Sequence, residues 1–135
     1  MLRVLTGCAA VLLLTACGGD GSALDGEFRC SFFFRESSEQ PSFEEQVLAI
    51  PPNQDVVATL GKLDLKARFS SDQFEGNAFS LSVAAGETSV WSALYQFGDT
   101  LPENQFAGGH GFTGLIYLTH PSEGGDYQLF CESVP

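Results

Sequence analysis

The sequence is poor in basic residues, with 6 Lys and Arg against 17 Asp and Glu and a formal net charge of -11. Nucleic-acid binding requires a basic surface, so nucleic acid is not an expected partner. Anionic lipid likewise attracts Lys and Arg, which excludes electrostatic docking on such a membrane. No CxxC or HxxxH spacing, phosphate loop, dinucleotide fingerprint or nucleophile elbow occurs. The sequence therefore predicts no metal and no cofactor.

Long apolar runs are missing after residue 16, and the run before it is too short for a membrane span. Val4 to Leu14 follows Arg3 and is mostly apolar, whereas a transmembrane helix needs about 20 apolar residues. A positive charge, a short apolar run and small residues before a cut site are typical of a secretion signal. The residues Leu14-Thr15-Ala16-Cys17 resemble the lipobox of bacterial lipoproteins.

This resemblance implies that residues 1–16 form a signal peptide and that Cys17 becomes the acylated first residue of the mature protein. The alternative is an ordinary signal peptide that precedes a cysteine. Two or more acyl chains, such as palmitate, hold a protein stably on a membrane. In the enterobacterial form of the family, Asp after the cysteine retains a lipoprotein on the inner membrane. Gly18 stands there, so we expect an outer-membrane anchor in the cell envelope, facing the periplasm or the cell surface.

The lipidated segment 17–26 is rich in Gly and Ser and is predicted to be a flexible tether. The remaining residues, 27–135, are enough for one domain. Of the 4 cysteines, Cys8 lies in the signal peptide and Cys17 is taken by lipid. Cys30 and Cys131 remain, and in an oxidising compartment such a pair favours a disulfide. Two unpaired buried thiols are the alternative.

Hydrophobicity along residues 27–135 alternates with period two, which is typical of half-buried strands. The alternation is strict from 62 to 69, where Leu63, Leu65 and Phe69 share one parity. No segment keeps a helical period for three turns. We therefore predict an all-β fold of about eight short strands, an antiparallel β-sandwich or small β-barrel, with one disulfide linking the first and last strands. The expected strands are 27–35, 44–50, 56–60, 62–69, 78–83, 88–97, 111–119 and 126–134. An alternative is one long strand from 56 to 69, bulged at Gly61.

Candidate chemistry centres on His110, which lies in the glycine-rich stretch 108–111 with Asp99 and Glu103 nearby. These residue types can hold a metal or seat a general base. The alternative is an ordinary polar residue in a glycine loop. His120, which precedes Pro121, is interpreted as a turn residue.

Three other sets of residues each allow two interpretations, one as a binding site and one as a structural feature. The acidic residues of segment 36–45 can gather calcium or form a solvated loop. Lys62, Lys66 and Arg68 form a basic stripe or protect an exposed or edge strand. The last group shares the parity of Ala93 and forms either an aromatic binding face or part of the core; it consists of Trp91, Tyr95 and Phe97.

The leading functional hypothesis is a lipid-anchored envelope lipoprotein with a non-enzymatic binding or structural domain. Loss of Arg3 leaves 5 basic against 17 acidic residues, a net charge of -12, which favours a basic protein or peptide as partner. Anchor, compact β domain, disulfide and acidity are similar to the membrane-bound C-type lysozyme inhibitors, which is one alternative. That family's Phe-Trp-x-Lys-Gly segment has no counterpart, because Val90-Trp91-Ser92 lacks the lysine and glycine. The other alternative is a small hydrolase that uses His110.

Overall fold

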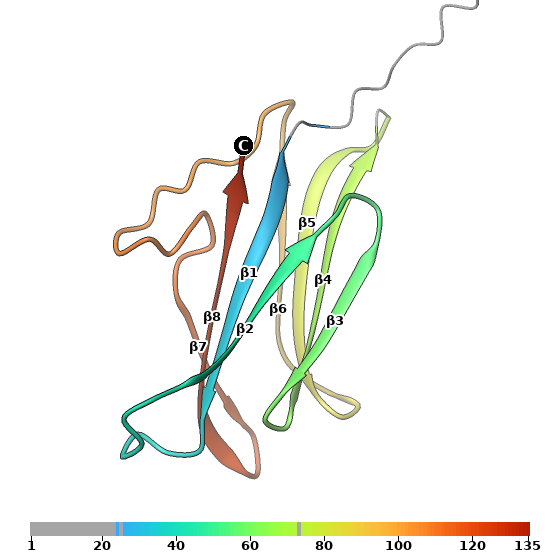
Figure 1. The fold of residues 1–135 in the computed structure, drawn as a ribbon. Coiled ribbons are helices and arrows are strands. Elements are labelled where there is room, and N and C mark those ends of the chain that lie inside the picture. The colour runs from blue at the N-terminus through green and yellow to red at the C-terminus, as the bar shows by residue number, and fades with distance from the viewer. Residues whose placement is uncertain (1–23, 25, 73) are drawn as a thin grey trace, which may run out of the picture.

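The computed structural model describes Leu24 and residues 26–72 and 74–135. The expected signal peptide 1–16, Cys17 and most of the tether lie outside these residues. Within the part described, no helix is long and apolar enough to cross a membrane. In the residues described, all regular structure is strand (Figure 1). The strands are β1 (Glu27–Arg35), β2 (Glu44–Ile50), β3 (Asp55–Leu60), β4 (Leu63–Asp72), β5 (Gly76–Ala85), β6 (Thr88–Phe97), β7 (Ile116–His120) and β8 (Gly124–Val134).

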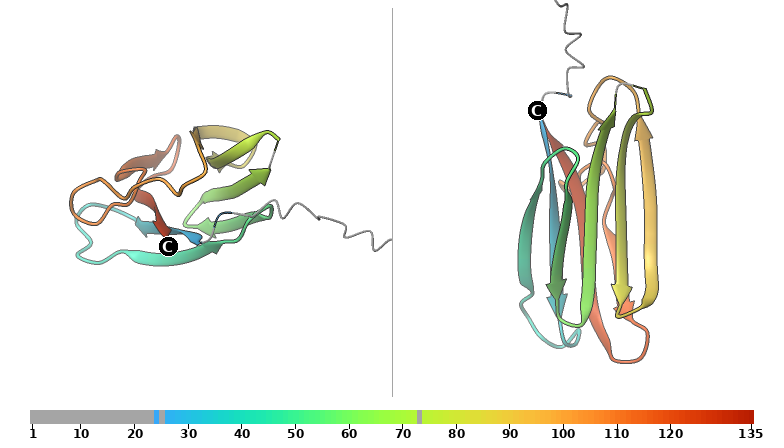
Figure 2. Two further views of the ribbon diagram at one scale, coloured as in Figure 1. Left: turned by 90° about the horizontal axis from the view of Figure 1, so that it is seen from above. Right: turned by 90° about the vertical axis from the view of Figure 1, so that its right-hand side faces the viewer.

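The strands form two four-stranded antiparallel sheets, in the orders β2-β1-β8-β7 and β3-β4-β5-β6. The two sheets pack as two layers around one core (Figure 2). This confirms the all-β fold, and the sandwich is the architecture observed. A path around the molecule meets the strands in chain order, from β1 to β8 and back to β1. Below, the upper end is the end at which β8 finishes, at the top of Figure 1.

The core consists of aliphatic and aromatic side chains, most of which the period-two pattern directs inward. Phe28 contacts three other phenylalanine rings: its ring centroid is 4.7 Å from that of Phe69, 4.9 Å from Phe79 and 5.4 Å from Phe112. All four side chains are buried. Edge-on and tilted aromatic pairs of this kind add to the free energy gained from burying apolar area. The inward side chains of both sheets therefore form one continuous core.

Cys30 and Cys131 are bonded, as predicted, and lie directly opposite each other on β1 and β8. The backbone of Cys131 faces away from β1: its N–H donates to Thr113 Oγ1, and its C=O accepts from the N–H of Phe112. The two cysteines therefore form a non-hydrogen-bonded pair, the position in an antiparallel ladder where Cα atoms are closest. Their Cα atoms are 4.1 Å apart. The first and last strands are thus joined side by side.

The structure corrects two predicted strand boundaries. The alternative of one strand from 56 to 69 is wrong, because β3 and β4 form a hairpin in which Leu60 pairs with Leu63. Gly61 turns the chain with a φ of 59°, as the first central residue of a type II′ turn does. The strand predicted at 111–119 begins only at Ile116. Gly111 and Gly114 have positive φ, which interrupts extended structure before that point.

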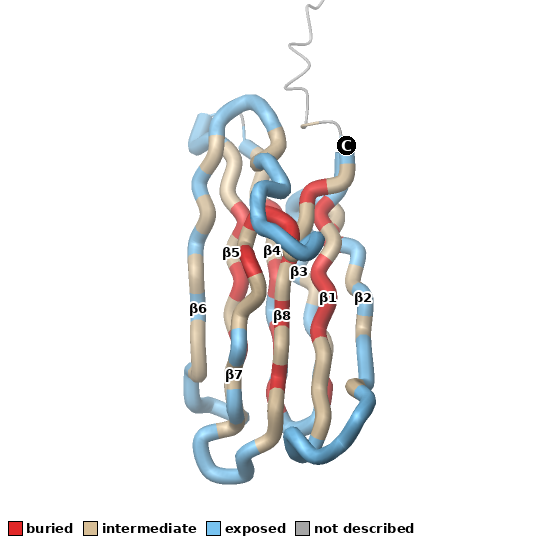
Figure 3. The backbone as a smooth tube through the Cα atoms, turned by 90° about the vertical axis from the view of Figure 1, so that its left-hand side faces the viewer, coloured by how far each residue is buried: buried red, intermediate tan, exposed pale blue. Residues whose placement is uncertain are grey.

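The long connection 98–115 carries the chain from β6 back to the other sheet. Its middle part runs beside the upper end of β8, where β7 is absent. The carboxamide of Asn104 both donates to the C=O of Ser133 (2.7 Å) and accepts from its N–H (2.9 Å). Ser133 Oγ donates to the C=O of Pro102. Figure 3 shows this connection as a mostly exposed segment that crosses the upper end of β8.

Candidate functional site

A pocket of about 420 Å³ opens between the upper end of β6 and the connection 98–115. Three aromatic side chains line it: Tyr95 and Phe97 from β6, and Phe112 from the connection. The other lining residues are Gln96, Pro102, Glu103 and Gln105. Gln96, Glu103 and Gln105 are exposed, whereas the three aromatic residues are buried or half-buried. The pocket therefore has an apolar floor and a polar rim, as small-molecule sites usually do.

The topology explains why the pocket forms at this place. β6 ends one sheet and β7 ends the other, and the two do not pair; we call the gap between them the β6–β7 seam. β7 is short, and its first residue, Ile116, already pairs with Leu129 in the middle of β8. The upper half of β6 therefore faces the irregular connection instead of a strand. An irregular segment cannot cover a strand edge evenly, which leaves a cavity.

Tyr95 is the titratable group held deepest in this pocket. Its ring stands edge-on to Phe112 with centroids 5.4 Å apart. Burial raises the pKa of the phenol above its usual value, so the side chain is neutral and able to donate at neutral pH. Among the described residues its hydroxyl makes no hydrogen bond, although it is not sealed from solvent. It is therefore available to a ligand.

The three predicted residues Asp99, Glu103 and His110 do not come together. Glu103 lines the pocket, whereas neither Asp99 nor His110 does. The His110 ring packs edge-on against Phe130, with centroids 5.4 Å apart, on the outer face of the sheet. Within residues 24, 26–72 and 74–135 it makes no side-chain hydrogen bond or ion pair. Gly108 and Gly109 have positive φ angles, so the chain turns just before His110.

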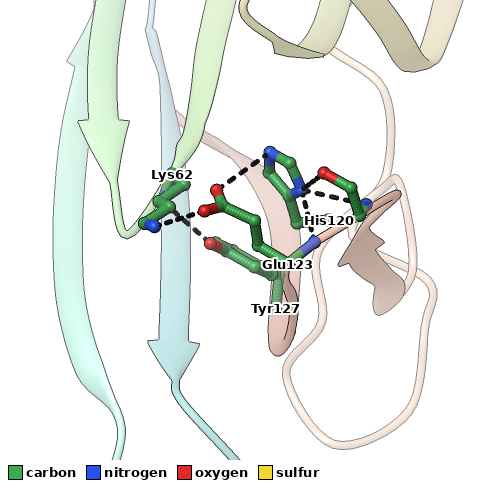
Figure 4. A network of polar contacts seen from close by, with 5 residues as sticks. Lys62, His120, Glu123 and Tyr127 are labelled. Carbon is green, nitrogen blue, oxygen red and sulfur yellow. Dashed lines mark hydrogen bonds and ion pairs between the residues drawn. The ribbon is translucent and has the colours of Figure 1, made fainter.

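The histidine with polar partners is His120, which the sequence placed in a turn. In Figure 4, Glu123 of the β7–β8 turn lies between Lys62 of the β3–β4 turn and His120, the last residue of β7. Lys62 Nζ lies 2.5 Å from Glu123 Oε1, and the Lys62 N–H donates to the hydroxyl of Tyr127 at 2.9 Å. The hydrogen bond between Lys62 and Glu123 raises the pKa of the lysine and lowers that of the carboxyl group. The network ties the two sheets together at the lower end.

Ser122, His120 and Glu123 are the residue types of an acyl-transfer triad, but their geometry is that of a turn. Nδ1 of His120 already accepts the N–H groups of Ser122 (3.2 Å) and Glu123 (3.0 Å). Ser122 Oγ is 3.4 Å from the same nitrogen, and Nε2 is 3.6 Å from Glu123 Oε2. Because Nδ1 is occupied by two backbone donors, it cannot readily take a proton from the serine. We interpret the group as a support for the turn.

The predicted basic stripe is neutralised, and β4, which carries Lys66 and Arg68, is an inner strand of its sheet. Asp55 of β3 lies 3.4 Å from Lys66 and 3.3 Å from Arg68. Partial desolvation works against ionisation of Asp55, but these two partners hold its pKa below the usual value. In the part of the chain that the structure describes, no group of three His, Cys, Asp or Glu could hold a metal ion. The acidic segment 36–45 therefore lacks the geometry of a calcium site.

Negative charge remains unbalanced over the domain. Each Lys and Arg after residue 26 faces a carboxylate: the acidic partners are Glu27, Asp55, Glu123, Asp126 and Glu132. Of the 17 acidic residues, two precede residue 26 and five have these basic partners, which leaves ten without one in the described residues. Glu103 at the pocket rim is one of the ten.

Comparison of the chain with protein-family models, with characterised proteins and with solved structures finds no match. The site therefore has to be interpreted from its own geometry. The alternation of the sequence places Tyr95 and Phe97 on one strand face, but it does not indicate which other residues line the pocket. Phe112 lay inside a predicted strand, and no periodicity could show which part of an 18-residue connection packs against β6.

Proposed function

We propose that this chain is a lipid-anchored lipoprotein of a bacterial cell envelope whose β-sandwich domain binds a partner and does not catalyse a reaction. The observation that carries the proposal is the Cys30–Cys131 disulfide. Such bonds persist in oxidising compartments outside the cytoplasm, which agrees with the export implied by the lipobox-like residues ending at Cys17. The pocket at the upper end of β6, with its apolar floor and polar rim, supports a binding role.

A basic protein or peptide is the partner that the charge distribution favours. Ten carboxylates without basic partners surround a domain in which every Lys and Arg of the described residues is already paired. A surface of one sign accelerates encounter with molecules of opposite charge and repels those of like charge. Lysozyme belongs to this class of basic partner, as the similarity to lysozyme inhibitors implies.

The anchor is tested by Cys17→Ser, with Cys8→Ser as the matched control. We expect labelled palmitate to enter the wild-type protein and the Cys8 variant but not the Cys17 variant. The Cys17 variant should also leave the membrane fraction after a salt wash. Label on that variant, or its retention on salt-washed membranes, would contradict lipidation at this residue.

The partner class is tested by retaining envelope proteins on the immobilised full chain at low and high salt. We expect the retained proteins to be more basic than the input and to elute between 0.05 and about 0.5 M salt, because screening shortens the Debye length to a few ångströms. Retained proteins with the charge distribution of the input would contradict a basic partner.

A further inference from the structure

We infer that the pocket at the upper end of β6 binds the ammonium group of a lysine side chain presented by the partner. This inference deepens the binding role proposed above and rests on it. Three properties of the pocket support it: the chemistry of its floor, the charge of its rim and its size.

The floor offers π-electrons to a cation. Tyr95, Phe97 and Phe112 converge on one cavity, and the negative face of an aromatic ring attracts an ammonium group within about 6 Å. Several rings around one site act together, as in the aromatic cages that bind alkylated ammonium groups. The rings are held in place by the core, since Phe97 packs against Phe28 and Phe69. The floor is therefore preorganised and does not have to form on binding.

The rim carries a negative charge and free hydrogen-bond acceptors. Glu103 is the charged residue of the lining, and none of the Lys and Arg residues that the structure describes lines the pocket. Glu103 has no basic partner among the described residues. The hydroxyl of Tyr95 and the carboxamides of Gln96 and Gln105 add further oxygens. An ammonium group donates three hydrogen bonds and accepts none, so this set of groups suits it and repels an anion.

The size of the pocket suits a lysine rather than a bare ion. A volume of about 420 Å³ lies within the range of small-molecule sites, roughly 300–1,000 Å³. It can take a four-carbon stem as well as the charged head. Lysine stems pack along apolar surface while the head reaches polar groups, and Pro102 with the ring of Phe97 provides such surface. The aromatic floor would thus contact both parts of the side chain.

The test is a titration of the full chain, purified in a non-ionic maltoside detergent so that no other organic cation competes. The probe is an acetylated, amidated tripeptide Gly-Lys-Gly, and the matched ligand has norleucine in place of lysine, which keeps the stem and removes the charge. Nuclear magnetic resonance shifts locate the site. We expect the lysine peptide to shift the signals of Tyr95, Phe97, Phe112 and Gln105 with millimolar affinity, and the norleucine peptide to leave them unchanged.

Three variants assign the contributions. Glu103→Gln should weaken lysine binding about threefold to tenfold, and Tyr95→Leu should weaken it by about tenfold. Tyr95→Phe should retain most of the binding, because the ring remains. Glu87→Gln is the control: it removes one exposed carboxylate from the β5–β6 turn at the lower end of β6 and should change nothing. Thermal unfolding of each variant establishes that the fold is intact.

Several outcomes would overturn the inference. Equal losses in Glu103→Gln and Glu87→Gln would mean general electrostatic attraction. Equal shifts with lysine and norleucine would mean an apolar site. Binding of glycerophosphoethanolamine without binding of the lysine peptide would assign the pocket to a lipid headgroup. If basic envelope proteins are still retained in full by Tyr95→Leu, the binding role stands and this site for it is wrong.

Discussion

Gly61 and Gly86 occupy the same position in two hairpin turns but differ in what surrounds them. Both have a φ near 60°, where an alanine is disfavoured by about 1–2 kcal/mol. A Cβ on Gly86 would meet open space, whereas a Cβ on Gly61 would overlap the hydroxyl of Tyr127 and touch the ring of Phe34. Gly61 therefore allows a close approach between the two sheets in addition to forming a turn.

We expect Gly86→Ala to lower the free energy of unfolding by about 1–2 kcal/mol. Gly61→Ala should lower it by a further 1–3 kcal/mol, roughly the cost of overpacking, because Tyr127 must move and its hydrogen bond with the Lys62 N–H is lost. Urea unfolding of both variants measures the difference. Equal losses would show that the contact with Tyr127 has no energetic weight.

Only some residues of the candidate site could be placed from the sequence alone. Parity identified Tyr95 and Phe97 as neighbours on one strand face, because a strand repeats every two residues. It could not place Glu103 or His110, since their positions depend on the φ angles of several glycines in the connection 98–115. His120 was predicted to be a turn residue, but it ends strand β7. Its partner Glu123 bonds to Lys62 in a turn of the other sheet, 58 positions away from His120 in sequence (62 and 120).

Among the elements, the β4–β5 hairpin depends on Asp72. Its carboxylate accepts the N–H groups of Phe74 (2.7 Å) and Glu75 (2.9 Å). The hydrogen bond from Glu75, followed by that from Phe74, lowers the pKa of Asp72. A carboxyl group whose pKa is lower in the folded than in the unfolded state stabilises the fold above the unfolded value, at about pH 4. The stabilisation disappears as the pH falls through the folded value.

Asp72→Ala should therefore lower the melting temperature at pH 7, and the difference from wild type should shrink below about pH 4. Asp72→Asn retains an oxygen acceptor, so it should lose less at pH 7, and its difference from the alanine variant should not change with pH. Thermal scans between pH 2.5 and 7 test this. A difference between wild type and Asp72→Ala that stays constant over this range would contradict the role of the charge.

The strands could be predicted from the sequence because most of them are buried on one face only, which makes their hydrophobicity alternate. The bounds of β1, β2 and β6 agree with the alternation of their residues. The prediction failed where apolar residues are buried without being in a strand: Phe112 packs edge-on against Phe79 from an irregular segment. Alternation reports burial, and it reports secondary structure only where burial and extension coincide.

In the molecule as a whole, the disulfide links the first strand to the last. It joins residues separated by 101 positions, and for a loop of this size the chain-entropy model gives about 4–5 kcal/mol of stabilisation. The double variant Cys30→Ala and Cys131→Ala should keep the sandwich, because β1 and β8 still pair along their whole length. Its free energy of unfolding should fall by a few kcal/mol.

Equilibrium unfolding with and without reductant tests this. Reduction should destabilise the wild type and leave the double variant unchanged. Thiol counting on the denatured, unreduced wild type should find no free thiol at Cys30 or Cys131. Unaltered stability after reduction would show that strand pairing alone holds the ends of the domain.

The bond between Cys30 and Cys131 also makes the chain from 30 to 131 a covalent ring. A protease that cuts once in the exposed connection at the upper end opens this ring but releases no fragment. The cut protein should migrate as one band without reductant and as two with it. Two cuts within the ring, or reduction after one, are needed before any part of this ring can leave. A domain built in this way resists loss of material to the first cleavage, wherever in the ring that cleavage falls.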